Sequence, residues 1–317
     1  MASDIVIQGL NVTFESSTGP VHAVRDLNTV FCSGRISGII GESGSGKSVM
    51  GMSILRLLPN TAAVEGKCMY EGEDLYTVSN KRLRQIRGSS IGLIPQNPSA
   101  SLDPVMRIRR QITEGILAHR HSLSSAEADR QAEELVREFG FTNPEEILKS
   151  YSFQMSGGMN QRLVSAMGLA SQPSWIIADE PTKGLDAVLR NQVYRVLRQI
   201  CWERKRSMIL ITHDLLLAER LCDDIRVMYM GQIVEQGPVE EVMQHPRHPY
   251  TKGLIHSLPE RGMHPIPPPA FDRKQEGGCP FYPRCSQAEE RCKQAAPEER
   301  ARAGGGFVRC FFDAGDS

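Results

Sequence analysis

The segment GESGSGKS at positions 41–48 limits what this chain can fold into more than any other part of the sequence. It holds three glycines and no apolar side chain, so it adds nothing to a hydrophobic core. An apolar run at 35–41 precedes it, and a helix-like run at 49–58 follows it. A flexible serine–glycine turn is the plain alternative, but strand, loop and helix in succession favour a phosphate-binding loop. Four residues match the pattern G-x-x-x-x-G-K-[ST] of such loops: Gly41, Gly46, Lys47 and Ser48.

A loop of this kind turns main-chain N–H groups toward phosphate, here including those of Ser43 and Gly44. In this interpretation Lys47 reaches the β- and γ-phosphates of a nucleotide, and the hydroxyl of Ser48 ligates Mg²⁺. The sequence therefore predicts a site for ATP with Mg²⁺.

A second phosphate-handling element is predicted where the apolar segment SWIIADE (174–180) ends in two carboxylates. Asp179 suits the Mg²⁺ shell, and Glu180 suits a base that polarises the attacking water. Two surface acids at the end of a strand are the alternative, which the nearby glycine-rich loop makes weaker. Another apolar run, SMILIT (207–212), precedes His213. Between this run and the one at 174–180, apolar residues recur at the spacing of a helix. This alternation predicts a mostly parallel α/β sheet, with the histidine at its ligand-binding edge.

The segment FQMSGGMNQR (153–162) places small residues at the start of another predicted helix: Ser156, Gly157 and Gly158. The N-terminus of that helix is a second element suited to anions. One nucleotide within one chain has no use for two such elements on opposite sides of it. Two chains that face each other do.

With these motifs the chain resembles the ATP-binding subunits of ABC transporters, over roughly residues 5–240. The resemblance implies an α/β fold: a P-loop NTPase ABC cassette with a RecA-like core, a small antiparallel β subdomain and a helical signature lobe. It identifies the segment at 153–162 as the signature loop. It also assigns four further residues: Gln96 to the glutamine loop, His213 to the switch histidine, Asp186 to the D-loop and Phe14 to the aromatic that stacks on adenine.

The resemblance further implies how the residues share the work. Glu180, His213 and Gln96 are expected to be catalytic, and Gln96 to contact Mg²⁺ as well. The sequence departs from the common pattern at Met159, where many members have Gln. It also departs at Lys183 and Gly184 in the D-loop, where many members have small or hydroxyl residues.

The expected organisation has three parts. Residues 1–96 and 156–240 form the nucleotide-binding core, 97–155 a helical subdomain, and 241–317 a C-terminal extension. The stretch HPRHPYTKGL (245–254) resembles the extension of ATPases that serve oligopeptide, dipeptide and nickel importers. The proline-rich segment PIPPPAF that follows it is predicted to be a stiff linker.

Four of the eight cysteines lie in the extension: Cys279, Cys285, Cys292 and Cys310. Their spacing lacks the C-x₂₋₄-C pairs that are usual in zinc ribbons, whereas four thiolates can hold an iron–sulfur cluster. The stretch CPFYPRC also resembles the cluster-binding tail of peptide-importer ATPases. We expect one [4Fe–4S] cluster with a structural role and no contact with ATP. Zinc and metal-free thiols stay open as alternatives.

Composition limits which kinds of molecule this chain is expected to bind. The formal net charge is zero, which argues against nucleic acid, and no apolar run reaches the length of a membrane span. The segment MASDIVIQGLNVTFE alternates like a strand rather than a signal peptide. The chain is therefore expected on the cytoplasmic face of the inner membrane, as a peripheral subunit.

The resemblance implies ATP hydrolysis that powers import of peptides or a related small solute, such as nickel or a metal chelate. The implied partners are two transmembrane permease subunits, a second ATPase subunit that is related rather than identical, and an extracytoplasmic solute-binding protein. The sequence does not select the solute.

The main alternative is a soluble ABC ATPase that takes no part in transport. Enzymes of DNA repair carry long insertions between the phosphate and signature loops, and this interval is too short for one. Ribosome-binding factors carry two cassettes, and one is found. A non-catalytic partner subunit would not need the carboxylate and histidine at 180 and 213.

Overall fold

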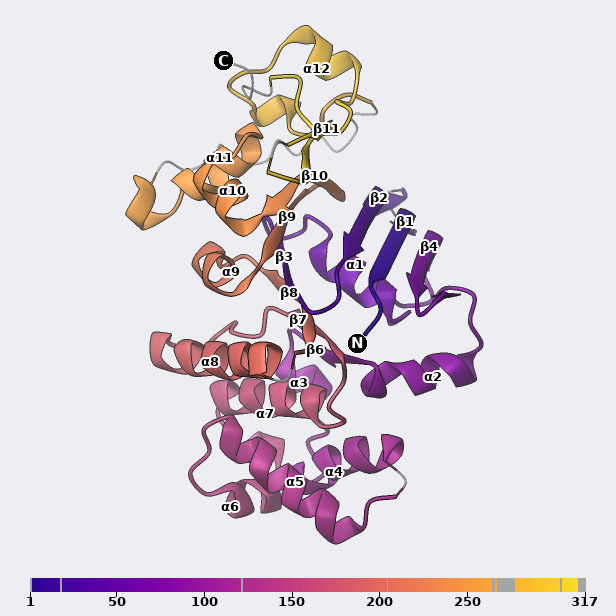
Figure 1. The fold of residues 1–317 in the computed structure, drawn as a ribbon, viewed down its shortest axis with the longest axis vertical. Coiled ribbons are helices and arrows are strands. Elements are labelled where there is room, and N and C mark those ends of the chain that lie inside the picture. Colours follow the sequence, from indigo (N-terminus) through magenta and orange to yellow (C-terminus); the bar gives the residue numbers. More distant parts are fainter. Residues whose placement is uncertain are drawn as a thin grey trace.

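The structure is a computed structural model, in which helices pack against two β-sheets (Figure 1). It describes residues 2–17, 19–120, 122–203, 205–263, 266, 277–302 and 304–312. The linker predicted at 265–271 lies, apart from residue 266, outside the described residues.

An eight-stranded sheet forms the centre of the molecule, in the order β11-β12-β10-β9-β3-β8-β7-β6. The five strands from β9 to β6 run parallel to one another, and β10 pairs antiparallel with β9. Every residue of β3, β7 and β8 is buried, as apolar strands with both faces covered require. The predicted α/β sheet is thus confirmed. The parallel strands are β3 (Ile36–Ile40), β6 (Ile91–Ile94), β7 (Trp175–Asp179), β8 (Ser207–Thr212) and β9 (Asp224–Tyr229).

A second, antiparallel sheet has the order β2-β1-β4-β5. Along β1 buried residues such as Ile5 and Ile7 alternate with more exposed ones, so one face of this sheet joins the core. This is the antiparallel subdomain that the resemblance implied. Its strands are β1 (Ile5–Phe14), β2 (Val21–Phe31), β4 (Ala62–Tyr70) and β5 (Glu73–Asp74).

Helices cover the sheets, and α4, α5 and α6 lie at one end of the long axis in Figure 1. The start of α5 is fixed by a capping box, in which Ser124 accepts from the main-chain N–H of Glu127 and the Glu127 carboxylate accepts from the N–H of Ser124. The helices before β9 are α1 (Lys47–Ile54), α2 (Asn80–Ser89), α3 (Pro98–Ser101), α4 (Ile108–His119), α5 (Ser125–Glu138), α6 (Pro144–Lys149), η1 (Ser152–Gln154), α7 (Gly157–Leu169), α8 (Ala187–Glu203) and α9 (Leu215–Leu221).

The C-terminal elements are short and lie at the other end of the molecule (Figure 1). Strand β12 pairs antiparallel with β10, so this part of the chain extends the main sheet rather than standing apart from it. The elements are β10 (Gln232–Pro238), α10 (Val239–Gln244), α11 (Pro249–His256), η2 (Pro259–Arg261), η3 (Tyr282–Arg284), α12 (Glu290–Gln294), β11 (Arg300–Ala301) and β12 (Phe307–Val308).

A buried ion pair fastens these elements to the sheet. Arg302, after β11, pairs with Glu235 of β10, and both side chains are at most 1% exposed. Glu235 also accepts hydrogen bonds from the main-chain N–H groups of Arg247 and His248, at 2.9 and 3.0 Å. The buried carboxylate is therefore compensated by one charge and two further donors.

Across the described ranges, no helix combines the length and the apolar character that crossing a membrane requires.

Candidate functional site

The glycine-rich loop connects the buried strand β3 to helix α1. Its turn depends on Gly46, whose φ is +100°. A Cβ atom there would lie 2.2 Å from the carbonyl oxygen of Ala23 in β2. Only glycine fits so close to a neighbouring strand, which explains its place in the motif.

Lys47, at the start of α1, is buried against this loop. Its ammonium group donates to the carbonyl oxygens of Gly41 and Glu42, at 2.8 and 2.7 Å. Burial lowers the pKa of Lys47, and the carboxylates of Glu180, Asp179 and Glu42 act in the opposite direction. The site therefore holds a positive charge among three acids.

Ser48 and Asp179 meet at the ends of two elements that are 131 residues apart in the sequence. The serine hydroxyl donates to Oδ1 of Asp179 over 3.0 Å. Burial raises the pKa of Asp179, and Glu180 adds to this, while the bond from Ser48 opposes it. A hydroxyl and a carboxylate in contact are the oxygen ligands that Mg²⁺ prefers, so this pair fits the predicted Mg²⁺ site.

Glu180 follows β7 and is buried, with an unusual φ of +49°. Its Oε1 lies 2.8 Å from Nδ1 of His213 and accepts from the main-chain N–H of His213 over 3.0 Å. Thr212 adds a weaker bond of 3.4 Å from its hydroxyl to Oε2. The carboxylate is thus held in one orientation beside the exposed ring of the histidine.

Two other predicted site residues lie at or just after the ends of strands. Gln96 is half-buried just after the end of β6. Phe14 is the last residue of β1, partly buried, and pairs with Val21 and Ala62 on the neighbouring strands.

The predicted signature loop leads into α7. Ser156 caps this helix, accepting from the main-chain N–H of Met159 over 3.2 Å. Ser156 and Gly157 are exposed, whereas Gly158 packs so closely on Leu185 that an added Cβ would lie 3.2 Å from that side chain. The signature loop therefore contacts the segment that carries Asp186.

The departure at Gly184 has a backbone reason, because its φ is +74°. Two residues later, Asp186 accepts from the main-chain N–H of Leu189 over 2.9 Å at the start of α8. Nothing in the structure explains Lys183 or Met159.

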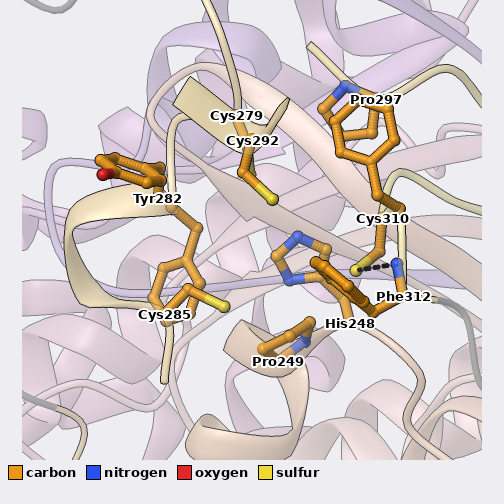
Figure 2. Close-up of a pocket in the computed structure, with 11 residues that line it drawn as sticks. His248, Pro249, Cys279, Tyr282, Cys285, Cys292, Pro297, Cys310 and Phe312 are labelled. Atoms are coloured by element: carbon orange, nitrogen blue, oxygen red, sulfur yellow. Dashed lines mark hydrogen bonds between the residues drawn. The ribbon is translucent and has the colours of Figure 1, made fainter. Parts of the chain in front are cut away.

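The four cysteines of the C-terminal part line one pocket, shown in Figure 2. The other residues that line it are mostly aromatic or proline: His248, Pro249, Phe281, Tyr282, Pro297, Phe311 and Phe312. Burial raises the pKa of the Cys279 thiol to about 11. Among the described residues no three His, Cys, Asp or Glu side chains come close enough together to hold a single metal ion.

Sequence reasoning missed two residues that contact the phosphate loop. The hydroxyl of Tyr250 in α11 accepts from the main-chain N–H of Glu42 over 2.8 Å. Arg284, next to Cys285, forms an ion pair with the side chain of Glu42. The only signal was that both lie in stretches with a family resemblance; no pattern predicts contacts across more than 200 residues.

Comparisons with known proteins agree with this arrangement. Residues 24–183 match the family model for the ABC transporter, and residues 234–292 match that for the oligopeptide/dipeptide transporter C-terminal region. The second match covers β10 to α12, including three of the four clustered cysteines.

Related proteins match along nearly the whole chain. The dipeptide transport ATP-binding protein DppD of Haemophilus influenzae is 37% identical over 301 residues, covering 92% of this chain and 90% of DppD. The oligopeptide transport ATP-binding protein AppD of Bacillus subtilis is 35% identical over 328 residues, covering 98% of this chain and 97% of AppD. The dimeric structure of the bacterial ABC transporter cassette MJ0796 superposes with a TM-score of 0.68 at 25% identity, covering 74% of this chain and 98% of that one. The chain therefore belongs to the ABC transporter family, in the oligopeptide/dipeptide importer branch, and is an ATPase that hydrolyses ATP to drive transport.

Proposed function

We propose that this chain powers the import of peptides by hydrolysing ATP in a site that it completes with a second ATPase subunit. The observation that carries the proposal is the carboxylate of Glu180, held by His213 beside the Ser48–Asp179 pair. A fixed base next to a Mg²⁺ site is what phosphoryl transfer to water requires.

The residues divide the work as follows. The main-chain N–H groups of the phosphate loop and Lys47 bind the phosphates, with Gly41, Ser43, Gly44 and Gly46 allowing the turn. Ser48, Asp179 and Gln96 would hold Mg²⁺, which would supply positive charge beside the phosphates. Glu180 orients the attacking water and His213 orients Glu180. Phe14 stacks on the adenine.

The signature loop serves the partner's nucleotide. Ser156 and Gly157 are exposed at a helix N-terminus, which favours anions. Asp186 borders the same surface through the packing of Gly158 on Leu185. We infer a related rather than identical ATPase as the partner, with two permease subunits and an extracytoplasmic solute-binding protein completing the importer.

The peptide substrate is supported by the C-terminal match and by the names of relatives such as DppD and AppD. The inferred place is the cytoplasmic face of the inner membrane. The inferred division is a nucleotide-binding core at 1–96 and 156–240, a helical subdomain at 97–155, and an extension at 241–317.

The test compares ATP turnover per cassette in the dilute isolated chain and in the assembled transporter. Turnover should be much higher in the assembly, because each site needs a signature loop from the other cassette. A Ser156→Arg change in this chain should then block the partner's site and leave this chain's MgATP affinity unchanged. Equal turnover in the isolated and assembled forms would refute the shared site.

We also propose that Cys279, Cys285, Cys292 and Cys310 hold one [4Fe–4S] cluster. The cluster would cross-link four positions of a segment whose helices and strands are short. Four thiols around one apolar pocket suit a multi-iron cluster. Zinc is the alternative, and against it stands the sequence spacing, which lacks the C-x₂₋₄-C pairs that are usual in zinc ribbons.

The cluster is tested by metal and sulfide analysis of anaerobically purified protein. Iron and sulfide should each be near four per chain, about the ratio that the cluster's formula requires. Cys285→Ser should lose the iron, whereas Cys32→Ser, a change at an exposed cysteine elsewhere, should keep it. One zinc per chain without iron would favour the zinc alternative.

A further inference from the structure

We propose that Arg284 is a positioning residue for the phosphate loop, and that it couples the cysteine pocket to nucleotide binding through Glu42. The inference rests on the proposed role of the phosphate loop in binding MgATP. The expectation that the cluster makes no contact with ATP is unchanged, because the link that we infer runs indirectly through Glu42.

The contact between Arg284 and Glu42 is a two-pronged ion pair. Nη1 and Nη2 of Arg284 donate to Oε2 and Oε1 of Glu42, each over 2.8 Å. The Arg284 side chain is 2% exposed and that of Glu42 is 34% exposed. A planar guanidinium that grips both carboxylate oxygens fixes direction as well as distance.

Glu42 is held on its main chain as well. Its N–H donates to the hydroxyl of Tyr250, and its carbonyl oxygen accepts from the ammonium group of Lys47. The residue that Arg284 grips therefore also positions the lysine that we expect to bind phosphate. A shift of Glu42 would move an anchor of that lysine.

The other end of the coupling is the cysteine pocket. Arg284 ends the short helix η3, and its main-chain N–H donates to the carbonyl oxygen of Phe281 over 3.0 Å. Phe281 lines the pocket and packs on Tyr229 and Tyr250, with ring centroids 5.3 and 5.4 Å apart. The next residue in the chain is Cys285 itself. Filling or opening the pocket therefore acts on the segment that carries Arg284.

Charge explains why the ion pair between Arg284 and Glu42 matters for nucleotide binding. A carboxylate on the phosphate loop repels the phosphates of a nucleotide and attracts the ammonium group of Lys47. Arg284 neutralises that carboxylate and turns it toward the C-terminal part of the chain. Without Arg284, Glu42 would compete with the nucleotide for Lys47.

The experiment measures the Kd for MgATP of the full chain with and without the ion pair between Arg284 and Glu42. Arg284→Met should weaken binding by about tenfold, within the range usual for coupling between two sites. Arg309→Met is the matched control, because Arg309 is also largely buried and also precedes a cysteine of the pocket, but it pairs with the exposed Glu299. It should leave the Kd unchanged.

The double variant Glu42→Gln/Arg284→Met separates positioning from general damage. Removing the unpaired charge should restore most of the lost affinity, which a merely structural role of Arg284 would not predict. If Arg284→Met does not fold, Arg284→Lys should fold and show a smaller loss, since it keeps the charge and loses the two-pronged geometry.

Equal affinity in Arg284→Met and Arg309→Met, or no recovery in the double variant, would overturn the inference. Failure of the wild-type chain to bind MgATP would instead overturn the proposed function. The two failures are therefore distinguishable.

Discussion

The phosphate loop and the cysteine pocket are fixed in the molecule in different ways. The loop joins strands and a helix in the middle of the sheet, where β3, β7 and β8 are wholly buried. The cysteines around the pocket lie on or beside elements of two to five residues, and Cys279, Phe281 and Cys292 join the main hydrophobic core. It is fastened to the rest of the molecule by two arginine–glutamate pairs, Arg302–Glu235 and Arg284–Glu42. Apolar burial therefore shapes both sites, and paired charges add a second support to the cysteine pocket.

The largest expected effect falls on chemistry at the first site alone. Glu180→Gln should lower the steady-state rate of ATP hydrolysis by about a thousandfold, because an amide keeps the shape but cannot act as a base. MgATP binding should persist, since Lys47 and the loop are unchanged. Turnover by the assembled transporter is the measurement, with Glu203→Gln on the exposed end of α8 as the control. A rate near that of the wild type would remove Glu180 from the proposed role.

The next effect falls on the second site alone. Arg302→Met should destabilise the C-terminal elements by about 3 kcal/mol, because it leaves the charge of Glu235 buried and unpaired. Hydrogen exchange should speed up in β12 and α12 and stay slow in β3 and β8. Arg300→Met, two residues earlier and exposed, is the control. Equal exchange in the two variants would show that the ion pair does not hold the pocket.

A smaller effect is expected at the turn of the phosphate loop. Gly46→Ala should lower the free energy of unfolding by about 2 kcal/mol, because alanine is strained in a left-handed backbone and its Cβ would clash with the carbonyl of Ala23. Gly34→Ala has a similar φ of +76° but open space around the added Cβ, so it should cost less. Thermal unfolding of both variants gives the comparison. If the two cost the same, strain alone would account for the glycine.

The strands of the main sheet were predictable because apolar runs at 35–41, 174–180 and 207–212 are contiguous. Some boundaries were wrong for local reasons: the helix predicted at 49–58 begins at Lys47 and ends at Ile54.

The contacts of Arg284 could not be predicted in the same way. Its partner Glu42 is 242 residues away, and it occupies a position of the loop motif where any residue is allowed. Such a contact depends on how two distant segments pack, which local periodicity and spacing do not encode. Glu180 and His213 were found because each follows an apolar strand, and neighbouring parallel strands bring their ends together.

The pairing of β12 with β10 also bears on how the protein avoids aggregating. A strand at the border of a sheet offers unpaired N–H and C=O groups to any other extended chain. Val308 and Phe307 pair with Glu235 and Gln236 of β10. The border then passes to β11, which is two residues long and begins with the exposed Arg300. A short, charged border strand is a poor template for another chain, so the C-terminal segment also shields the main sheet from joining edge to edge with its neighbours.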